Sequence, residues 1–264
     1  MRAEKENHRV TRASSRDKER TSTGPENVGQ SCPGTADWDI VAGCTRIFRA
    51  CGGRAPCICE ISCMSSLQIV HHCHPALRWK SRDVGRIDDS LRSMVEQMFE
   101  LMYAAKGIGL AANQVALPWR LFVINPSGDP QLKDEEVVFI NPRITRRNGS
   151  EESEEGCLSL PEIYGPVPRA TRILVDAFSL DGEQFEMELE DLDARVVQHE
   201  YDHLEGVLFT DRVSPQVLTE LRPLINELES RFRQRQTLGE IPSDAELRAA
   251  LRRLEKAVEA PQRL

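Results

Sequence analysis

The sequence has no long apolar segment and no excess of positive charge. No apolar run in its 264 residues approaches the roughly 20 residues that a membrane-spanning helix needs. A formal net charge of −8 is unfavourable for a surface whose main task is to bind nucleic acid. The N-terminus is polar and has no signal-peptide-like apolar segment behind its basic residues. We therefore expect a cytoplasmic protein with no membrane partner and no sequence-specific nucleic-acid partner.

The sequence also has no arrangement of cysteines that would crosslink the whole fold. Six of the eight cysteines lie in the first 63 residues, and only Cys73 and Cys157 follow. Cys57, Cys59 and Cys63 resemble a metal knuckle, but a zinc ribbon needs paired C-x-x-C spacings and no second pair follows. Residues 1–34 are polar without apolar periodicity, which is typical of disorder. We expect residues 1–63 to be a disordered extension, or to precede a true start at Met64.

Residues 64–213 have the composition of one globular domain, and 40% hydrophobic residues in the chain are enough for a core. A helix is predicted over residues 88–106, because capping oxygens precede an apolar stripe with helical spacing. Short strands are predicted at residues 66–70, 121–124, 137–140, 173–178 and 184–189. Asn-Pro pairs should end the second and third strands, and residues 143–155 should form a solvated connection. This order indicates an α+β fold with mixed or antiparallel sheets packed around a central metal-binding helix.

The C-terminal part, residues 214–264, is predicted to be a helical extension. A short extended segment is expected at residues 207–209, and Ser214-Pro215 should begin a helix that Pro223 kinks or breaks. Ser243 and Glu246 form a capping-box signature before a last helix of mixed charge. Because this helix is only mildly amphipathic, we expect it to be a solvated appendage.

The stretch with the clearest chemistry is Gln198–His203, which contains H-E-x-x-H. On a helix, His199 and His203 project from one face, so that both imidazoles can bind one metal ion. Glu200 lies between them, where it can exchange protons with a water molecule on the metal. A third ligand is needed, and Cys157 is the candidate, because one thiolate and two imidazoles leave a fourth position open for catalysis. The alternative is that Cys157 is a small buried hydrophobic residue.

At this point the sequence resembles the peptide deformylase family. Three stretches carry the resemblance in this order: G-x-G-x-A-A-x-Q at Gly107–Gln114, E-G-C-L-S at Glu155–Ser159 and Q-H-E-x-D-H at Gln198–His203. The similarity runs from about Leu67 to Val213. It implies a hydrolase that removes the N-formyl group from the formyl-methionine of newly synthesised polypeptides and releases formate. It also implies one Fe²⁺ ion per chain, with Zn²⁺, Ni²⁺ or Co²⁺ as substitutes, and makes the C-terminal helix a candidate ribosome contact.

The resemblance implies a role for each matching residue. Cys157, His199 and His203 would bind the metal, and Glu200 would act as general base on the metal-bound water and then as general acid. Gln114 and the backbone N–H of Leu158 would stabilise the oxyanion. The backbone of Gly109 would pair with the substrate main chain, while Ile108 and Val196 would line the pocket for the methionine side chain. An ion pair between Glu155 and Arg169 is expected beside the Cys157 loop.

Two other functions would use the same H-E-x-x-H residues or the same scaffold. An H-E-x-x-H zinc metalloprotease of the metzincin type needs a histidine where Phe209 stands, and no histidine follows His203. A protease of the gluzincin type would have to use Glu220 or Glu227, and it would leave E-G-C-L-S without a role. An inactive, deformylase-like binding protein is the second alternative, although every residue that the chemistry needs is present.

Overall fold

The structure is a computed structural model that describes residues 67–259, with side chains up to residue 256. The predictions for residues 1–63, namely the disordered extension, the start at Met64 and the Cys57–Cys63 knuckle, lie outside the described residues. Within residues 67–259, none of the helices has the length and apolar character required to cross a membrane.

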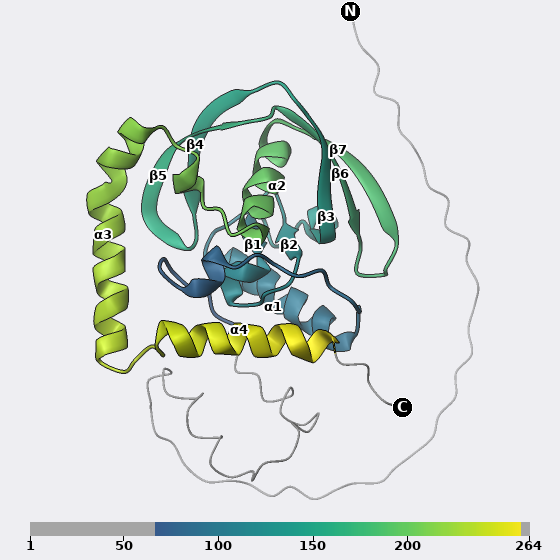
Figure 1. Ribbon diagram of the computed structural model, residues 1–264. Helices are drawn as coiled ribbons and strands as arrows, with labels where there is room; N and C mark the ends of the chain where they lie inside the picture. The colour runs from purple at the N-terminus through teal and green to yellow at the C-terminus, as the bar shows by residue number, and fades with distance from the viewer. Residues whose placement is uncertain (1–66, 260–264) are drawn as a thin grey trace, which may run out of the picture. The chain divides into compact units, whose positions relative to one another are not determined.

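The described chain is an α+β fold built on antiparallel strands (Figure 1). A five-stranded sheet has the order β1-β2-β3-β6-β7, and a separate two-stranded sheet pairs β4 with β5. All pairings between these named strands are antiparallel, so the sheets are not mixed. The strands are β1 (Gly109–Ala111), β2 (Leu121–Ile124), β3 (Val137–Asn148), β4 (Glu151–Cys157), β5 (Leu160–Arg169), β6 (Arg172–Phe178) and β7 (Gln184–Glu190). The α-helices are α1 (Asp89–Ala104), α2 (Asp191–Leu204), α3 (Pro215–Thr237) and α4 (Asp244–Glu259).

The predicted helix over residues 88–106 is confirmed as α1. The side chain of Asp88 accepts a hydrogen bond from the backbone N–H of Leu91, which satisfies one of the free donors of the first turn. The apolar stripe of α1 is buried against residues of β1 and β2, and includes Met98 and Met102, which have no exposed surface. This stripe is therefore core.

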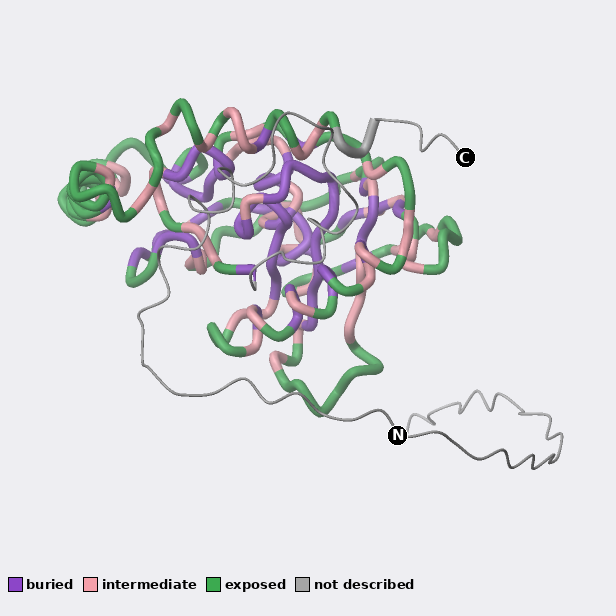
Figure 2. Tube along the Cα trace, turned by 90° about the horizontal axis from the view of Figure 1, so that it is seen from below, coloured by how far each residue is buried: buried purple, intermediate pink, exposed green. Residues whose placement is uncertain are grey.

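Helix α2, which carries the H-E-x-x-H residues, contacts β1, β2, β6 and β7. Its buried residues Ala194, Val197 and Leu204 share a core cluster with Phe122 and Phe139 of the sheet. Figure 2 shows how the buried residues gather at the centre of the described chain. One face of α2 is thus fixed by the sheet, and the other face is available for polar chemistry.

Strand β3 does not end at Asn141-Pro142 as predicted. Asn141 has a φ of 53°, and the pairing of β3 with β6 shifts register between Ile140 and Arg143. The side chain of Asn141 accepts from the backbone N–H of Val84 (2.7 Å) and donates to its carbonyl (3.0 Å). Proline is tolerated at such a bulge because no ladder hydrogen bond is needed from it. The Asn-Pro pair therefore bends the strand, whereas Asn125-Pro126 does follow the end of β2.

Two further local predictions are wrong. Residues 143–155 are the end of β3 and most of β4, and their charged side chains are largely exposed on paired strands. Residues 67–70 form no strand, because their backbone donors find scattered acceptors: Leu67 N–H donates to the Gln97 side chain and Val70 N–H to the carbonyl of Gln114. By contrast, β6 and β7 lie within one residue of their predicted bounds.

The C-terminal part contains two helices, and the last of them is not the solvated appendage that was predicted. Helix α3 continues through Pro223, which is exposed, while Leu221 and Ile225 on either side pack with β5 residues. The segment before it turns into a short 3₁₀ helix, η6 (Phe209–Asp211), so only its first residues are extended. The predicted capping box is present, since Ser243 N–H donates to Glu246 (2.9 Å). Helix α4 then packs on the 3₁₀ helix η3 (Pro75–Arg78), which buries Leu251 to 2% exposure.

Candidate metal centre and active site

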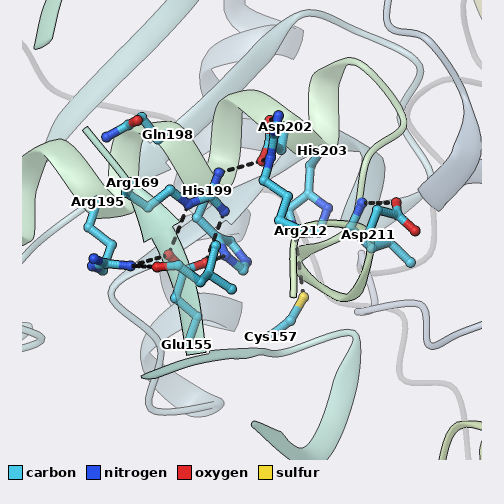
Figure 3. A network of polar contacts seen from close by, with 12 residues as sticks. Glu155, Cys157, Arg169, Arg195, Gln198, His199, Asp202, His203, Asp211 and Arg212 are labelled. Atoms are coloured by element: carbon cyan, nitrogen blue, oxygen red, sulfur yellow. Dashed lines mark hydrogen bonds and ion pairs between the residues drawn. The ribbon is translucent and has the colours of Figure 1, made fainter. Parts of the chain in front are cut away.

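Three potential metal ligands meet where β4 ends beside α2. One ligand atom each from Cys157, His199 and His203 lies within 4.8 Å of the others, and this is the one such group found in residues 67–259. Cys157 Sγ lies 3.4 Å from His203 Nε2 (Figure 3). Bonds of about 2.3 Å to sulfur and about 2.0 Å to nitrogen in a tetrahedral site put these atoms about 3.5 Å apart. The donor set and its spacing therefore fit one metal ion with an open fourth position.

The two histidines differ in their surroundings and in their protonation. His199 Nδ1 lies 2.9 Å from Glu155 Oε2, which leaves Nε2 for the metal. Burial lowers the pKa of His199, but hydrogen bonds with Cys157 and Glu155 raise it to about 10, so metal binding at Nε2 has to displace a proton. Burial lowers the pKa of His203 well below its usual value, and the charge of His199 lowers it further. His203 is therefore neutral at physiological pH.

Glu155, two residues before Cys157, is the centre of a buried charge network (Figure 3). Arg169 binds it through two hydrogen bonds of 2.9 Å each, and Arg195 adds a third of 2.8 Å. Burial alone would raise the pKa of Glu155, but the hydrogen bonds from His199 and Arg169 lower it to about 2. The predicted Glu155–Arg169 ion pair is thus confirmed, and it is nearly inaccessible, with side chains 5% and 3% exposed.

The network continues from Arg169 to the far end of α2. Arg169 donates to Asp202, and Asp202 also accepts two hydrogen bonds from Arg212, which follows η6. Asp202 directly precedes His203. Both histidine ligands are therefore adjacent to groups that are tied to Arg169.

Glu200 points toward the same centre from α2. It is 4% exposed, and its Oε2 has no hydrogen-bond partner among the described residues. Burial raises the pKa of Glu200 to about 7, which suits a group that takes up and returns a proton near neutral pH. A Cβ on Gly109 would lie 2.5 Å from Glu200 Oε1, so a larger residue here would have to displace this carboxyl group.

Gln114 lies beside Cys157, and Leu158 directly follows it in the chain. Gln114 Oε1 accepts from Ala111 N–H (2.8 Å), which turns its amide nitrogen to within 3.4 Å of Cys157 Sγ. Leu158 packs closely over Gly107, where a Cβ would lie 2.7 Å from its Cδ1. The two glycines of the first motif therefore make room for Glu200 and Leu158.

A cavity of about 700 Å³ opens in front of these groups. Ile108, Gly109 and Val196, the three predicted substrate-contacting residues, line it, as do Gln114, Cys157, Leu158, His199 and Glu200. Tyr164 and Leu192 also line it, although they are 58% and 51% exposed. Except for His203, all the residues predicted for the site therefore border one cavity, and His203 is connected to it through Cys157.

Residue positions expected for a protease are not part of this centre. Phe209, which stands where a metzincin has its third histidine, is buried, and its ring stacks on His199 with 6.3 Å between ring centroids. Glu220 and Glu227 are exposed on α3 and do not belong to the ligand group found in the described chain.

Sequence reasoning missed Arg195, Asp202 and Arg212 as members of the site. Arg195 and Asp202 lie four residues before and three residues after His199, so helical spacing could have placed both near it. No sequence pattern indicated Arg212, because its contact with Asp202 depends on how the chain turns after α2.

Comparison with known proteins finds similarity over most of the described residues. The family model for polypeptide deformylase matches residues 66–218. The peptide deformylase of Rhodopirellula baltica is 42% identical over 181 residues, which cover 69% of this chain and 90% of that protein. Peptide deformylase 1B, chloroplastic/mitochondrial, of Arabidopsis thaliana is 41% identical over 177 residues, and the chain spans only 64% of its length. A crystal structure of a peptide deformylase from Legionella pneumophila is 37% identical with a TM-score of 0.59, and the match covers 65% of this chain and 99% of that chain.

Proposed function

The chain belongs to the polypeptide deformylase family, and from this premise we propose how its residues share the work of the reaction. The enzyme removes the formyl group from the N-terminal formyl-methionine of new polypeptides and releases formate. The observation that carries the assignment is the group of Cys157, His199 and His203 ligand atoms within 4.8 Å of one another, beside the unpartnered carboxylate oxygen of Glu200. A binding protein without catalysis would have no use for that oxygen, and a metalloprotease would not use Cys157.

Cys157, His199 and His203 would hold one metal ion. When bound, the ion supplies a Lewis acid that polarises the formyl oxygen and makes a water molecule more acidic. We propose Fe²⁺ as the resident metal, because a thiolate with two imidazoles accepts this ion, and Zn²⁺, Ni²⁺ and Co²⁺ as substitutes. Metal analysis after anaerobic purification, with activity measured on the same samples, tests this choice.

Glu200 is proposed to move the proton. It accepts a proton from the attacking water as general base and returns it to the departing amine as general acid. Its position on α2 supports this role, because the carboxyl group is buried next to both histidines and one oxygen has no other partner. Its pKa near 7 favours both directions of transfer at neutral pH.

Gln114 and the backbone N–H of Leu158 are proposed as the oxyanion donors. The amide nitrogen of Gln114 is already directed at the ligand sulfur, and its carbonyl oxygen is held by Ala111. Such preorganised donors stabilise the negative charge that develops as the formyl carbon becomes tetrahedral.

Substrate binding is proposed at the free edge of β1. β1 is the terminal strand of its sheet and pairs with β2 on one side, so a peptide can add to the other side through the backbone of Gly109. Ile108 and Val196 line the cavity and would contact the methionine side chain. In this arrangement α2 is the metal-binding helix around which the sheets are packed.

We propose that the protein acts on nascent polypeptides, binds the ribosome and is located in the cytoplasm. Helix α4 turns Leu251 inward and leaves Arg248, Arg252, Arg253 and Lys256 exposed, which suits the phosphates of ribosomal RNA. Co-sedimentation of the full chain with ribosomes should decrease for the variant R252E/R253E. Cell fractionation tests the location.

Two substitutions test the proposed roles. We expect Cys157→Ala to lose both bound metal and formate release from a formyl-Met peptide. Glu200→Ala should keep its metal but lose turnover. An acetyl-Met peptide is the substrate control, and it should not be cleaved by the wild type. Full metal and activity in Cys157→Ala would remove Cys157 from the ligand set, and wild-type turnover in Glu200→Ala would remove Glu200 as the base.

A further inference from the structure

Arg195 makes three hydrogen bonds, all of them to the two-stranded sheet β4–β5. Its Nη1 donates to Glu155 Oε1 (2.8 Å) and to the carbonyl of Val167 (2.9 Å), and its Nη2 donates to the carbonyl of Glu151 (2.8 Å). Glu151 and Glu155 belong to β4, and Val167 belongs to β5. One guanidinium on α2 therefore binds both strands of the hairpin (Figure 3 shows Arg195 beside Glu155).

These bonds matter because the metal ligands come from two separate elements. Cys157 is the last residue of β4, whereas His199 and His203 lie on α2. β4 and β5 form a sheet of their own, so no strand pairing with the five-stranded sheet sets the position of Cys157 relative to α2. That position depends on side chains that cross between the hairpin and the helix.

Two arginines connect the β4–β5 hairpin with α2, one from each side. Arg169 on β5 reaches Asp202 on α2, and Arg195 on α2 reaches β4 and β5. Both also bind Glu155, which in turn orients His199. Arg195 differs from Arg169 in that it lines the cavity.

We propose that Arg195 is a positioning residue: its guanidinium fixes the distance between the Cys157 loop and the histidines of α2, while its stem only borders the cavity. The inference rests on the proposed function for its kinetic readout, and it assigns Arg195 no contact with the reacting atoms. Loss of the guanidinium frees the hairpin to move relative to α2 and loosens Glu155 behind His199. Residues that orient metal ligands in this way typically change metal affinity or activity by about 10- to 100-fold.

Three variants separate the guanidinium from the stem. Arg195→Met keeps a straight apolar side chain along the cavity wall and removes all three donors. Arg195→Lys keeps the charge but replaces the planar group with a single ammonium, which cannot span the three acceptors. Arg172→Met is the matched control, because Arg172 is a half-exposed arginine on β6 that pairs with Glu190 (2.7 Å) away from the cavity.

Each variant is compared with wild type in three measurements on the full chain. Zinc affinity is measured by chelator competition, and kcat and KM are measured with a formyl-Met peptide. The alkylation rate of Cys157 by iodoacetamide in metal-free protein is followed by mass spectrometry of its peptide, so it needs no metal and no activity. Circular dichroism verifies that each variant folds.

We expect Arg195→Met to bind zinc about 10- to 100-fold more weakly, to lose kcat by a similar factor with little change in KM, and to alkylate faster at Cys157. Arg195→Lys should fall between Arg195→Met and wild type, and Arg172→Met should match wild type.

Wild-type zinc affinity and alkylation in a folded Arg195→Met would overturn the inference. A change confined to KM would overturn it as well, because Arg195 would then only line the cavity. If Arg195→Met does not fold, Arg195→Lys decides by the same criteria. A wild-type protein that releases no formate would refute the proposed function. The zinc affinity and the alkylation rate would still test the positioning role of Arg195.

Discussion

Replacing Arg169 with methionine should be the most destabilising single change near the site. Its guanidinium makes two hydrogen bonds to Glu155 and one to Asp202, and the three side chains are only 3%, 5% and 8% exposed. Arg169→Met leaves both carboxylates in place with fewer compensating charges. Breaking a buried ion pair in this way costs about 3 to 5 kcal/mol, because the remaining charge stays away from water.

This loss can be measured as thermal unfolding of metal-free protein at pH 7. A change of about 1 kcal/mol shifts Tm by roughly 2 to 4 °C in a domain of this size, so Arg169→Met should lower Tm by about 6 to 20 °C. The control is Arg172→Met, whose partner Glu190 is half-exposed, and a surface pair of this kind contributes about 0 to 1 kcal/mol.

A double variant tests whether the uncompensated charge causes the loss of stability in Arg169→Met. Adding Glu155→Gln to Arg169→Met removes the uncompensated charge, so the double variant should lose less stability than the sum of the two single variants. If Arg169→Met shifts Tm no more than Arg172→Met does, or if the two changes are additive, the argument that the buried charges depend on one another is wrong.

Two further predictions concern the glycine beside Glu200 and the last helix. Gly109→Ala should retain metal but lower kcat, because its Cβ would lie 2.5 Å from Glu200 Oε1 and displace the carboxyl group; unchanged kcat in formate release would show that Glu200 can move without loss. Leu251→Ala should destabilise the protein by about 2 to 5 kcal/mol in urea unfolding, because Leu251 on α4 is only 2% exposed, whereas Arg252→Ala on the exposed face of the same helix should have little effect. Equal midpoints for these two variants would mean that α4 contributes no stability through its packing.

The elements that the sequence predicted best have strong local patterns. The α1 helix was predicted from a capping aspartate and an apolar stripe with helical spacing. The aspartate accepts a hydrogen bond within the first turn, and the stripe is buried along one face of the helix. β7 follows from strict alternation, and the structure shows the same alternation of more and less exposed residues. Where periodicity and capping decide the conformation, sequence reasoning needs no knowledge of the rest of the fold.

The prediction was wrong where distant partners decide the conformation. Asn141-Pro142 has the composition of a strand end, yet Val84, more than fifty residues earlier, satisfies the amide of Asn141 and lets β3 continue. The charged residues of β4 indicated a loop, because a two-stranded sheet with exposed faces has no apolar alternation. Helix α4 appeared only mildly amphipathic, because its packing depends on few residues, such as Leu251 and Glu255, which accepts from Trp79 Nε1 (2.8 Å).

The site shows the same division between what is local and what is not. His199, Glu200 and His203 follow from helix geometry, and Cys157 was found because metal chemistry required a third ligand. The ion pair of Glu155 with Arg169 was expected from motif position, but the contacts of Glu155 with Arg195 and His199 on α2 were not. A carboxylate in a run of exposed glutamates looks like a solvated residue, and only the fold shows that it is the one glutamate of β4 that is buried. The metal ligands can thus be predicted from their chemistry, whereas the contacts of Arg195, Asp202 and Arg212 become visible only after the hairpin and the helix have been brought together.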